Sequence, residues 1–163
     1  MITQEQVKKL FEYRNGELYW MINPCKNVKI GDMAGSLNNK GYKRTSINKK
    51  IYSIHRLIFL MHYGYLPRCL DHIDGNKVNN KIENLREATL SQNCYNAKKS
   101  SINTSGVKGV SWDSNNKKWR VRFCISNIQK DFGSYYDIKV AKFIAETMRY
   151  KYHGAFANHG EVA

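Results

Sequence analysis

The chain has 163 residues, enough for one ordinary domain or two small ones. Lys and Arg number 27 against 13 Asp and Glu, which gives a formal net charge of +14 and a pI near 9.7. A hydrophobic fraction of 42% argues against disorder. No apolar run approaches the roughly 20 residues that cross a bilayer, and residues 1–11 lack a signal-peptide segment. We therefore expect no membrane association and a cytoplasmic location.

The positive charge is spread along the chain. Residues 1–100 carry 17 basic and 8 acidic groups, net +9 (17 − 8), and residues 101–163 carry 10 and 5, net +5 (10 − 5). Lys and Arg drive association with nucleic acids by neutralising phosphates. Nucleic acid is therefore the expected partner of both parts, with plain solubilisation as the alternative. The four cysteines contain no Cys-x-x-Cys pair, so a zinc ribbon is not expected and reduced thiols are.

The N-terminal part is predicted to mix short helices and strands. Residues 3–11 begin with a capping-box pattern and place apolar side chains on one helical face. Residues 18–21 predict a short strand. Residues 42–47 and 51–54 flank a polar turn, which indicates a β-hairpin. Residues 55–63 are mostly apolar and stop at a glycine, which predicts a short buried helix.

The predicted hairpin is strongly basic. Seven basic residues and one acidic residue lie between positions 25 and 50. A solvated hairpin face and contact with a DNA backbone explain this excess equally well. Lys43 and Arg44 are the candidate DNA contacts here.

The C-terminal part has a different pattern. Residues 107–112, 118–125 and 128–133 predict three strands separated by polar turns. Asp137 is expected to cap a helix that ends at Gly154. The expected core face of that helix is Val140, Ile144, Met148 and Tyr152, and the expected solvent face is Lys139, Lys142, Glu146 and Arg149. Three strands and a helix after an α+β first part predict an α+β protein.

The segment most informative about chemistry is LDHIDGNKVNNKIENLREATLSQNCYN, residues 70–96. Asp71 and His72 end a strand-like run, Asn84 opens a second one, and Ser91 is a possible cap for a helix that carries Asn93. A calcium loop fails on ligand spacing. Two alternatives remain: an Asx-rich structural turn, or a hydrolytic site in which carboxylate and amide oxygens hold Mg²⁺ or Mn²⁺ beside a histidine base.

Three blocks in this region, HRL at 55–57, DHIDGNKVNN at 71–80 and ENLR at 83–86, closely resemble the HNH endonucleases of phage genomes and self-splicing introns. The resemblance implies a ββα-metal (His-Me finger) fold that binds Mg²⁺ or Mn²⁺. It assigns the general base to His72, base orientation to Asn84, and metal ligation to Asp71 and Asn93. Many members have a histidine where this chain has Asn93. His55 and Arg56 also fit family positions, where packing, support of the site and DNA contact are all open.

The C-terminal part resembles the APETALA-type (ethylene-response-factor) DNA-binding domain. The resemblance rests on GVKGVSWDSNNKKWRVRF at 106–123, FGSYYD at 132–137 and YHGAFAN at 152–158. It implies a three-stranded antiparallel sheet, packed on one helix, that enters the major groove. The implied DNA contacts are Lys108, Trp112, Trp119, Arg120 and Arg122; for the two tryptophans core packing is equally probable.

We therefore expect an HNH nuclease domain with a basic, strand-rich extension at residues 1–96, a polar linker at 97–105, and a βββα DNA-binding domain at 106–158. The predicted function is a metal-dependent phage homing endonuclease. It would act on double-stranded DNA as a monomer on an asymmetric site, in the host cytoplasm. The alternatives are a DNA-binding regulator with an inert nuclease fold and a restriction or defence nuclease.

Overall fold

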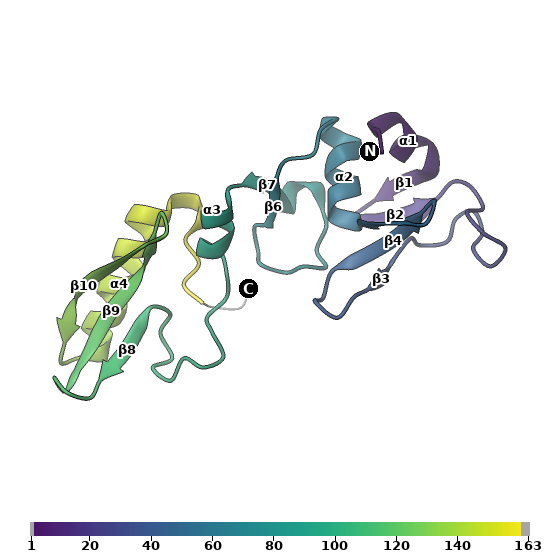
Figure 1. Cartoon of the computed structure of the whole chain (residues 1–163). Coiled ribbons are helices and arrows are strands. Elements are labelled where there is room, and N and C mark those ends of the chain that lie inside the picture. The colour runs from purple at the N-terminus through teal and green to yellow at the C-terminus, as the bar shows by residue number, and fades with distance from the viewer. Residues whose placement is uncertain (1, 161–163) are drawn as a thin grey trace. The chain divides into compact units, whose positions relative to one another are not determined.

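A computed structural model describes residues 2–160, and they divide into two compact units between Glu87 and Ala88 (Figure 1). We call residues 2–87 unit 1 and residues 88–160 unit 2. The predicted domain boundary follows residue 96, whereas the structural division lies about nine residues earlier. No helix within residues 2–160 is both long and apolar enough to cross a bilayer.

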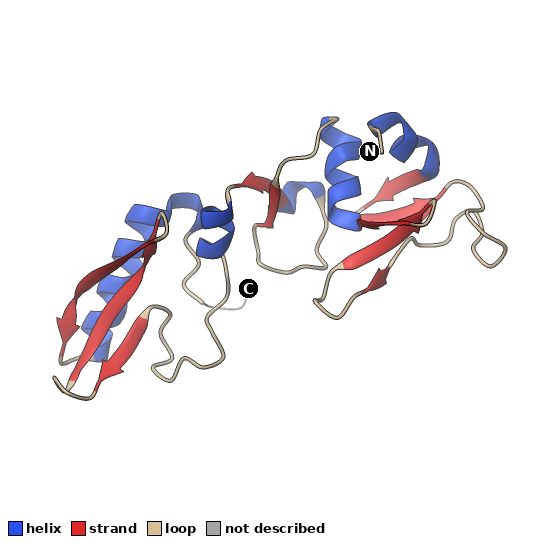
Figure 2. Cartoon of the chain, viewed as in Figure 1, coloured by secondary structure: helices blue, strands red, loops and turns tan. Residues whose placement is uncertain are grey.

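Unit 1 mixes short helices with three small sheets (Figure 2). Its elements in chain order are α1 (Gln4–Leu10), β1 (Phe11–Arg14), β2 (Glu17–Trp20), β3 (Ser36–Leu37), β4 (Lys43–Ile47), β5 (Lys50–Ser53), α2 (Ile54–Tyr63), β6 (Cys69–His72), the 3-10 turn η1 (Ile82–Asn84) and β7 (Leu85–Ala88). Strands β1 and β2 form a hairpin, β3, β4 and β5 form an antiparallel sheet, and β6 pairs with β7. The capping box on α1 and the β4–β5 hairpin agree with the sequence predictions.

Helix α2 is the centre of the unit 1 core. It ends at Gly64, which has a left-handed φ of 78° and donates its N–H to the carbonyl of Leu60 at 2.9 Å. Six of its ten residues are buried: Ile54, Leu57, Ile58, Phe59, Leu60 and Met61. A helix that is apolar on nearly all sides must be enclosed, and here α1, β1 and β2 supply apolar side chains around it.

Unit 2 contains α3 (Leu90–Tyr95), β8 (Val110–Asp113), β9 (Lys118–Ile125), β10 (Ile128–Tyr135), α4 (Ile138–His153) and the 3-10 turn η2 (Gly154–Phe156). The strands form one antiparallel sheet in the order β10-β9-β8, and α4 packs on one face of it (Figure 1). The core between sheet and helix is small, with Val110, Val121, Ala141 and Ala145 at its centre.

The buried face of α4 is shifted by one position along the sequence from the predicted face, so that every predicted core residue precedes an observed one. The buried positions are Ala141, Ala145, Arg149 and His153. The predicted core residues Val140 and Tyr152 are 44% and 41% exposed. Small alanine side chains let the helix backbone approach the sheet closely, which a search for large apolar residues cannot detect.

Arg149, predicted to face solvent, is only 1% exposed. Its guanidinium donates to the carbonyl of Lys108, lies 2.9 Å from Nδ1 of His159, and sits 5.6 Å from the ring centroid of Phe123. Its buried charge is thus surrounded by a carbonyl, an imidazole and an aromatic face. Burial lowers the pKa of Arg149 below its usual value.

The tight β1–β2 turn generates a testable prediction. Gly16 has φ of +89°, and a Cβ there would lie 2.8 Å from the backbone nitrogen of Lys81. Gly31 has φ of +90° with nothing within 4 Å of its Cβ position. Gly31→Ala should therefore cost only left-handed strain, about 1–2 kcal/mol. Gly16→Ala should lower the free energy of unfolding of unit 1 by about 1–3 kcal/mol more, because of overpacking. Urea denaturation followed by NMR signals of unit 1 measures both, and equal losses would contradict the clash.

Candidate active site

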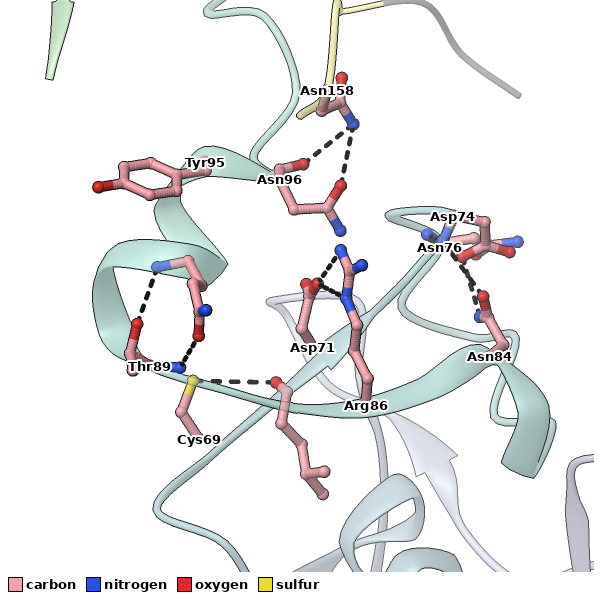
Figure 3. Close-up of polar contacts among 12 residues, drawn as sticks. Cys69, Asp71, Asp74, Asn76, Asn84, Arg86, Thr89, Tyr95, Asn96 and Asn158 are labelled. Atoms are coloured by element: carbon pink, nitrogen blue, oxygen red, sulfur yellow. Dashed lines mark hydrogen bonds and ion pairs between the residues drawn. The ribbon is translucent and has the colours of Figure 1, made fainter. Parts of the chain in front are cut away.

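Strand β6 ends in two adjacent buried side chains, Asp71 and His72, which are 4% and 5% exposed. From the paired strand β7, Arg86 donates Nε and Nη2 to Oδ2 of Asp71 at 2.9 and 2.8 Å (Figure 3). The arginine balances the charge of a carboxylate that would otherwise be costly to bury. The pairing of the two strands thus brings a carboxylate, an imidazole and a guanidinium to one end of a two-stranded sheet.

The loop between β6 and η1 is held by a network centred on Asn84. Its Nδ2 donates to Oδ1 of Asp74 at 3.0 Å and to the carbonyl of Asn79 at 2.8 Å, and its Oδ1 accepts from the Asp74 N–H at 3.1 Å. Nδ2 of Asn79 donates to Oδ2 of Asp74 at 2.7 Å. Gly75 (φ 68°) donates its N–H to the carbonyl of His72 at 2.9 Å. The Asx-rich turn is therefore real, and it adjoins the candidate site.

A residue absent from the predicted set, Asn80, contacts the imidazole. Its Oδ1 lies 3.0 Å from Nε2 of His72, and the side chain is 1% exposed. Asn84 closes the loop from which Asn80 projects, and its predicted role in orienting the base stays a prediction. The sequence did contain a signal, the consecutive Asn79 and Asn80, but the DHIDGNKVNN block does not tell which amide points inward.

Aromatic rings surround the imidazole of His72. The ring centroid of His55 lies 5.2 Å away in an edge-to-face arrangement, and that of Tyr42 lies 6.2 Å away. Burial, together with nearby positive charge, lowers the pKa of His55 to about 3, so its imidazole is neutral at physiological pH. Arg56, the other residue of uncertain role, donates to the carbonyl of Pro67 at 2.9 Å and so ties α2 to the segment before β6.

Asn93 lies on α3, in unit 2. The cap of α3 is Thr89 rather than the expected Ser91: the hydroxyl of Thr89 accepts from the Gln92 N–H at 3.2 Å, and Gln92 Oε1 accepts from the Thr89 N–H at 2.8 Å. The predicted pairing of Asn93 with Asp71 at a metal ion stays a prediction. Within residues 2–160, no group of three or more His, Cys, Asp or Glu side chains is arranged to hold a metal ion.

The predicted DNA contacts on β4 differ from each other. Arg44 is exposed, whereas Lys43 forms an ion pair with Glu17 of the β1–β2 hairpin and is half-buried. Arg44 is thus the more available of the two for a phosphate.

The predicted DNA contacts in unit 2 lie on opposite faces of its sheet. Trp119 packs against the core beside α4, and its cross-strand partner Trp112 lies 4.9 Å away between ring centroids. Because side chains alternate along β9, Arg120 and Arg122 point away from α4. Asp131 accepts from Nε of Arg120 at 2.5 Å and lies 3.8 Å from Nε of Arg122. The open face therefore carries two arginines held by one carboxylate.

Lys108 has an internal contact rather than an open position. Its ammonium donates to the carbonyls of Tyr95, at 2.9 Å, and Ala97. Burial and the neighbouring Arg149 guanidinium lower the pKa of Lys108 to about 8. The structure thus gives Lys108 a role in holding the end of α3, and its predicted DNA contact stays a prediction.

Comparison with known proteins assigns this region to a family. Residues 52–95, which include Asp71, His72, Asn84 and Asn93, match the model of an HNH endonuclease. Protein 3.8 of Escherichia phage T7 is 40% identical over 96 residues, which cover 58% of this chain and 78% of that protein. The chain belongs to the family of Protein 3.8. It contains an HNH endonuclease domain, and this confirms the predicted HNH-type nuclease.

A second relative of the HNH domain is an uncharacterized HNH endonuclease, L560, of Acanthamoeba polyphaga mimivirus. It is 46% identical over 61 residues, which cover 36% of this chain and 32% of that protein. No solved structure matches the chain. An HNH domain indicates hydrolysis of phosphodiester bonds, with DNA as the substrate. The match runs from unit 1 through α3, so the sequence domain extends past the structural division at residue 87.

The loop network predicts a pH dependence of stability. Burial alone would raise the pKa of Asp74, but hydrogen bonds from Asn79, the Asn76 N–H and Asn84 hold that pKa below its ordinary value of 3.8. A carboxylate with a lowered pKa stabilises the fold above the unfolded value, and this stability is lost as pH falls through the folded value. Asp74→Asn should lower the free energy of unfolding of unit 1 at pH 7 by about 1–3 kcal/mol. Urea titrations should show this difference narrowing below pH 4; a constant difference would contradict the assignment.

Proposed function

We propose that this protein is a metal-dependent phage homing endonuclease that cleaves double-stranded DNA. It would join a ββα-metal nuclease to a DNA-reading module. The observation that carries the proposal is the end of β6, where the buried carboxylate of Asp71 and the imidazole of His72 are adjacent in the HNH motif. Buried ionisable groups are concentrated at functional sites, and this favours a nuclease over a regulator with an inert fold.

His72 is the general base in this proposal. It would take a proton from a water molecule, whose oxygen then attacks phosphorus while the 3′ oxygen leaves. Asn80, at 3.0 Å from Nε2, and the rings of His55 and Tyr42 hold the imidazole in one orientation. Because His55 is neutral at physiological pH, it packs against His72 without a competing charge.

The ligands that the family resemblance implies, a carboxylate and an amide oxygen, are of the kind that suits a hard divalent cation. The Asp71 carboxylate, with an amide oxygen from Asn93 as the family resemblance implies, offers the oxygen ligands that Mg²⁺ or Mn²⁺ prefers. Once bound, such an ion would stabilise the negative charge that builds on the phosphate and on the departing oxygen. Arg86 supports the site by holding the Asp71 carboxylate at its Oδ2.

Unit 2 would read the DNA. Its three-stranded sheet backed by α4 has the arrangement that the APETALA-type resemblance implies, and the open face presents Arg120 and Arg122. In this proposal the face away from α4 enters the major groove, and the protein acts as a monomer on an asymmetric site in the host cytoplasm. Asp131 would keep the two arginines in place before DNA arrives.

Removing the metal ion or the imidazole of His72 should abolish or slow cleavage while DNA binding is retained. We expect Mg²⁺ or Mn²⁺ to support cleavage of phage DNA at a mapped site, and EDTA to abolish it while gel-shift binding persists. His72→Ala should lower the single-turnover rate by about 10²–10⁴-fold with the salt dependence of binding unchanged. Full cleavage in EDTA would overturn the metal assignment. Specific binding without cleavage in any metal would favour a regulator.

DNA reading should depend on the open face of the unit 2 sheet. Arg122→Ala should weaken binding by roughly 1–3 kcal/mol if the arginine reads a base, or lower the salt slope by about one if it touches phosphate. Lys130→Ala is a matched control, because Lys130 pairs with Phe123 and so lies on the other face of the same sheet. Gel shifts at several salt concentrations measure both variants. If Arg122→Ala and Lys130→Ala weakened DNA binding equally, the proposal that DNA binds the face away from α4 would be contradicted.

A further inference from the structure

Helix α3, which carries Asn93, cannot be stable by itself. It has six residues, Leu90–Tyr95, and none of them is buried. Isolated helices shorter than about 12 residues are marginal in water. The capping box of Thr89 and Gln92 secures its first turn, so the rest of its support must come from other parts of the chain.

A ring stack anchors the last turn of α3 to α4. The ring of Tyr95 lies parallel to that of His153, with centroids 3.7 Å apart and an interplanar angle of 1°. His153 is buried, and its Nε2 lies 3.1 Å from the carbonyl of Cys124 on β9. The Tyr95 hydroxyl accepts the Ser126 N–H at 2.6 Å. The stack therefore fixes α3 against a helix and a strand of unit 2 together.

The C-terminal end of α3 is closed by side chains from elsewhere in unit 2. Nδ2 of Asn158 lies 3.0 Å from the carbonyl of Asn96 and 3.3 Å from its Oδ1 (Figure 3). Lys108 donates to the carbonyls of Tyr95 and Ala97. The last carbonyls of a helix have no partner within the helix. Lys108 supplies a donor for the carbonyl of Tyr95, and Asn158 supplies one for the carbonyl of the C-cap residue Asn96.

The β9–β10 hairpin connects the contacts that hold α3 to the proposed DNA-reading face. Strand β9 carries Arg120 and Arg122 and leads directly into the turn at Ser126 and Asn127. That turn contacts α3 twice, through Ser126 to the Tyr95 hydroxyl and through the Ser91 hydroxyl, 3.3 Å from Oδ1 of Asn127. One hairpin thus joins the arginine face to the helix.

We propose that unit 2 is the scaffold of the nuclease helix as well as the DNA reader, with Tyr95, His153 and Asn158 as positioning residues for Asn93. Asn93 lies two residues before Tyr95 and donates its N–H to the carbonyl of Thr89, so the stack and the cap set its place on α3. The role of Asn93 in metal binding rests on the proposed function. The anchoring of α3 rests on contacts within unit 2 alone.

Full-length variants test the proposal. Tyr95→Ala removes the stack, Tyr95→Phe keeps the ring and loses only the hydroxyl, and Asn158→Ala opens the end of α3. Tyr150→Ala is the control, because Tyr150 is 73% exposed on α4. The measurements are amide hydrogen exchange of residues 89–96 and of β8–β10, the Mn²⁺ concentration for half-maximal cleavage, and the dissociation constant for DNA.

We expect Tyr95→Ala to speed exchange in α3 by about tenfold or more, with protection of β8–β10 retained. Asn158→Ala should act in the same direction and Tyr95→Phe much less. Both disruptive variants should need more Mn²⁺, with DNA affinity near wild type. The proposal would be overturned if Tyr95→Ala and Asn158→Ala both kept the wild-type exchange rate of α3 and the wild-type Mn²⁺ requirement. It would also be overturned if Tyr95→Phe sped exchange in α3 as much as Tyr95→Ala. If Tyr95→Ala unfolds β8–β10, Asn158→Ala decides the matter. A wild-type protein that never cleaves would overturn the proposed function, while exchange would still test the anchoring of α3.

Discussion

The structure around the HNH motif depends on one buried amide, that of Asn84. It donates to Asp74 and to the carbonyl of Asn79, and it accepts from the Asp74 N–H, so its donors and its acceptor are used within one loop. A buried amide with only part of these bonds would cost about 1–3 kcal/mol, which gives the loop a single favourable conformation. That conformation points Asn80 at the imidazole of His72 and presents β7, with Arg86, beside β6.

The motif uses one carboxylate to hold the loop and a different one at the candidate site. The carboxylate of Asp74 holds the loop and accepts hydrogen bonds from amides, whereas the carboxylate of Asp71 is paired with the guanidinium of Arg86. Both lie in the same short motif, three residues apart. An Asx-rich turn and a hydrolytic site are alternatives when judged from composition. In the folded chain the turn places Asn80 against His72 of the candidate site. The structural turn and the candidate site are therefore formed by different residues of one motif.

Local patterns predicted most of the elements and much of the motif. The caps of α1 and α4, the β4–β5 hairpin and the three strands of unit 2 depend on neighbours in sequence, and these predictions agree with the structure. The cap of α3 was expected at Ser91 and is Thr89. The buried face of α4 was mispredicted because two alanines and a buried arginine replace large apolar side chains there. The anchoring of α3 was missed for a different reason. The bond between Asn96 and Asn158 joins residues 62 positions apart, and no periodicity in either segment indicates it.

The sequence family and the folding units therefore divide the chain at different places. The HNH match continues through α3, the helix that carries Asn93. The structural unit begins before α3 because six residues without a buried side chain take their stability from α4, β9 and the C-terminal segment. Because α3 takes its stability from the rest of unit 2, that part of the chain cannot be exchanged freely. A replacement would have to supply an aromatic partner for Tyr95 and hydrogen-bond donors for the carbonyls of Tyr95 and Asn96.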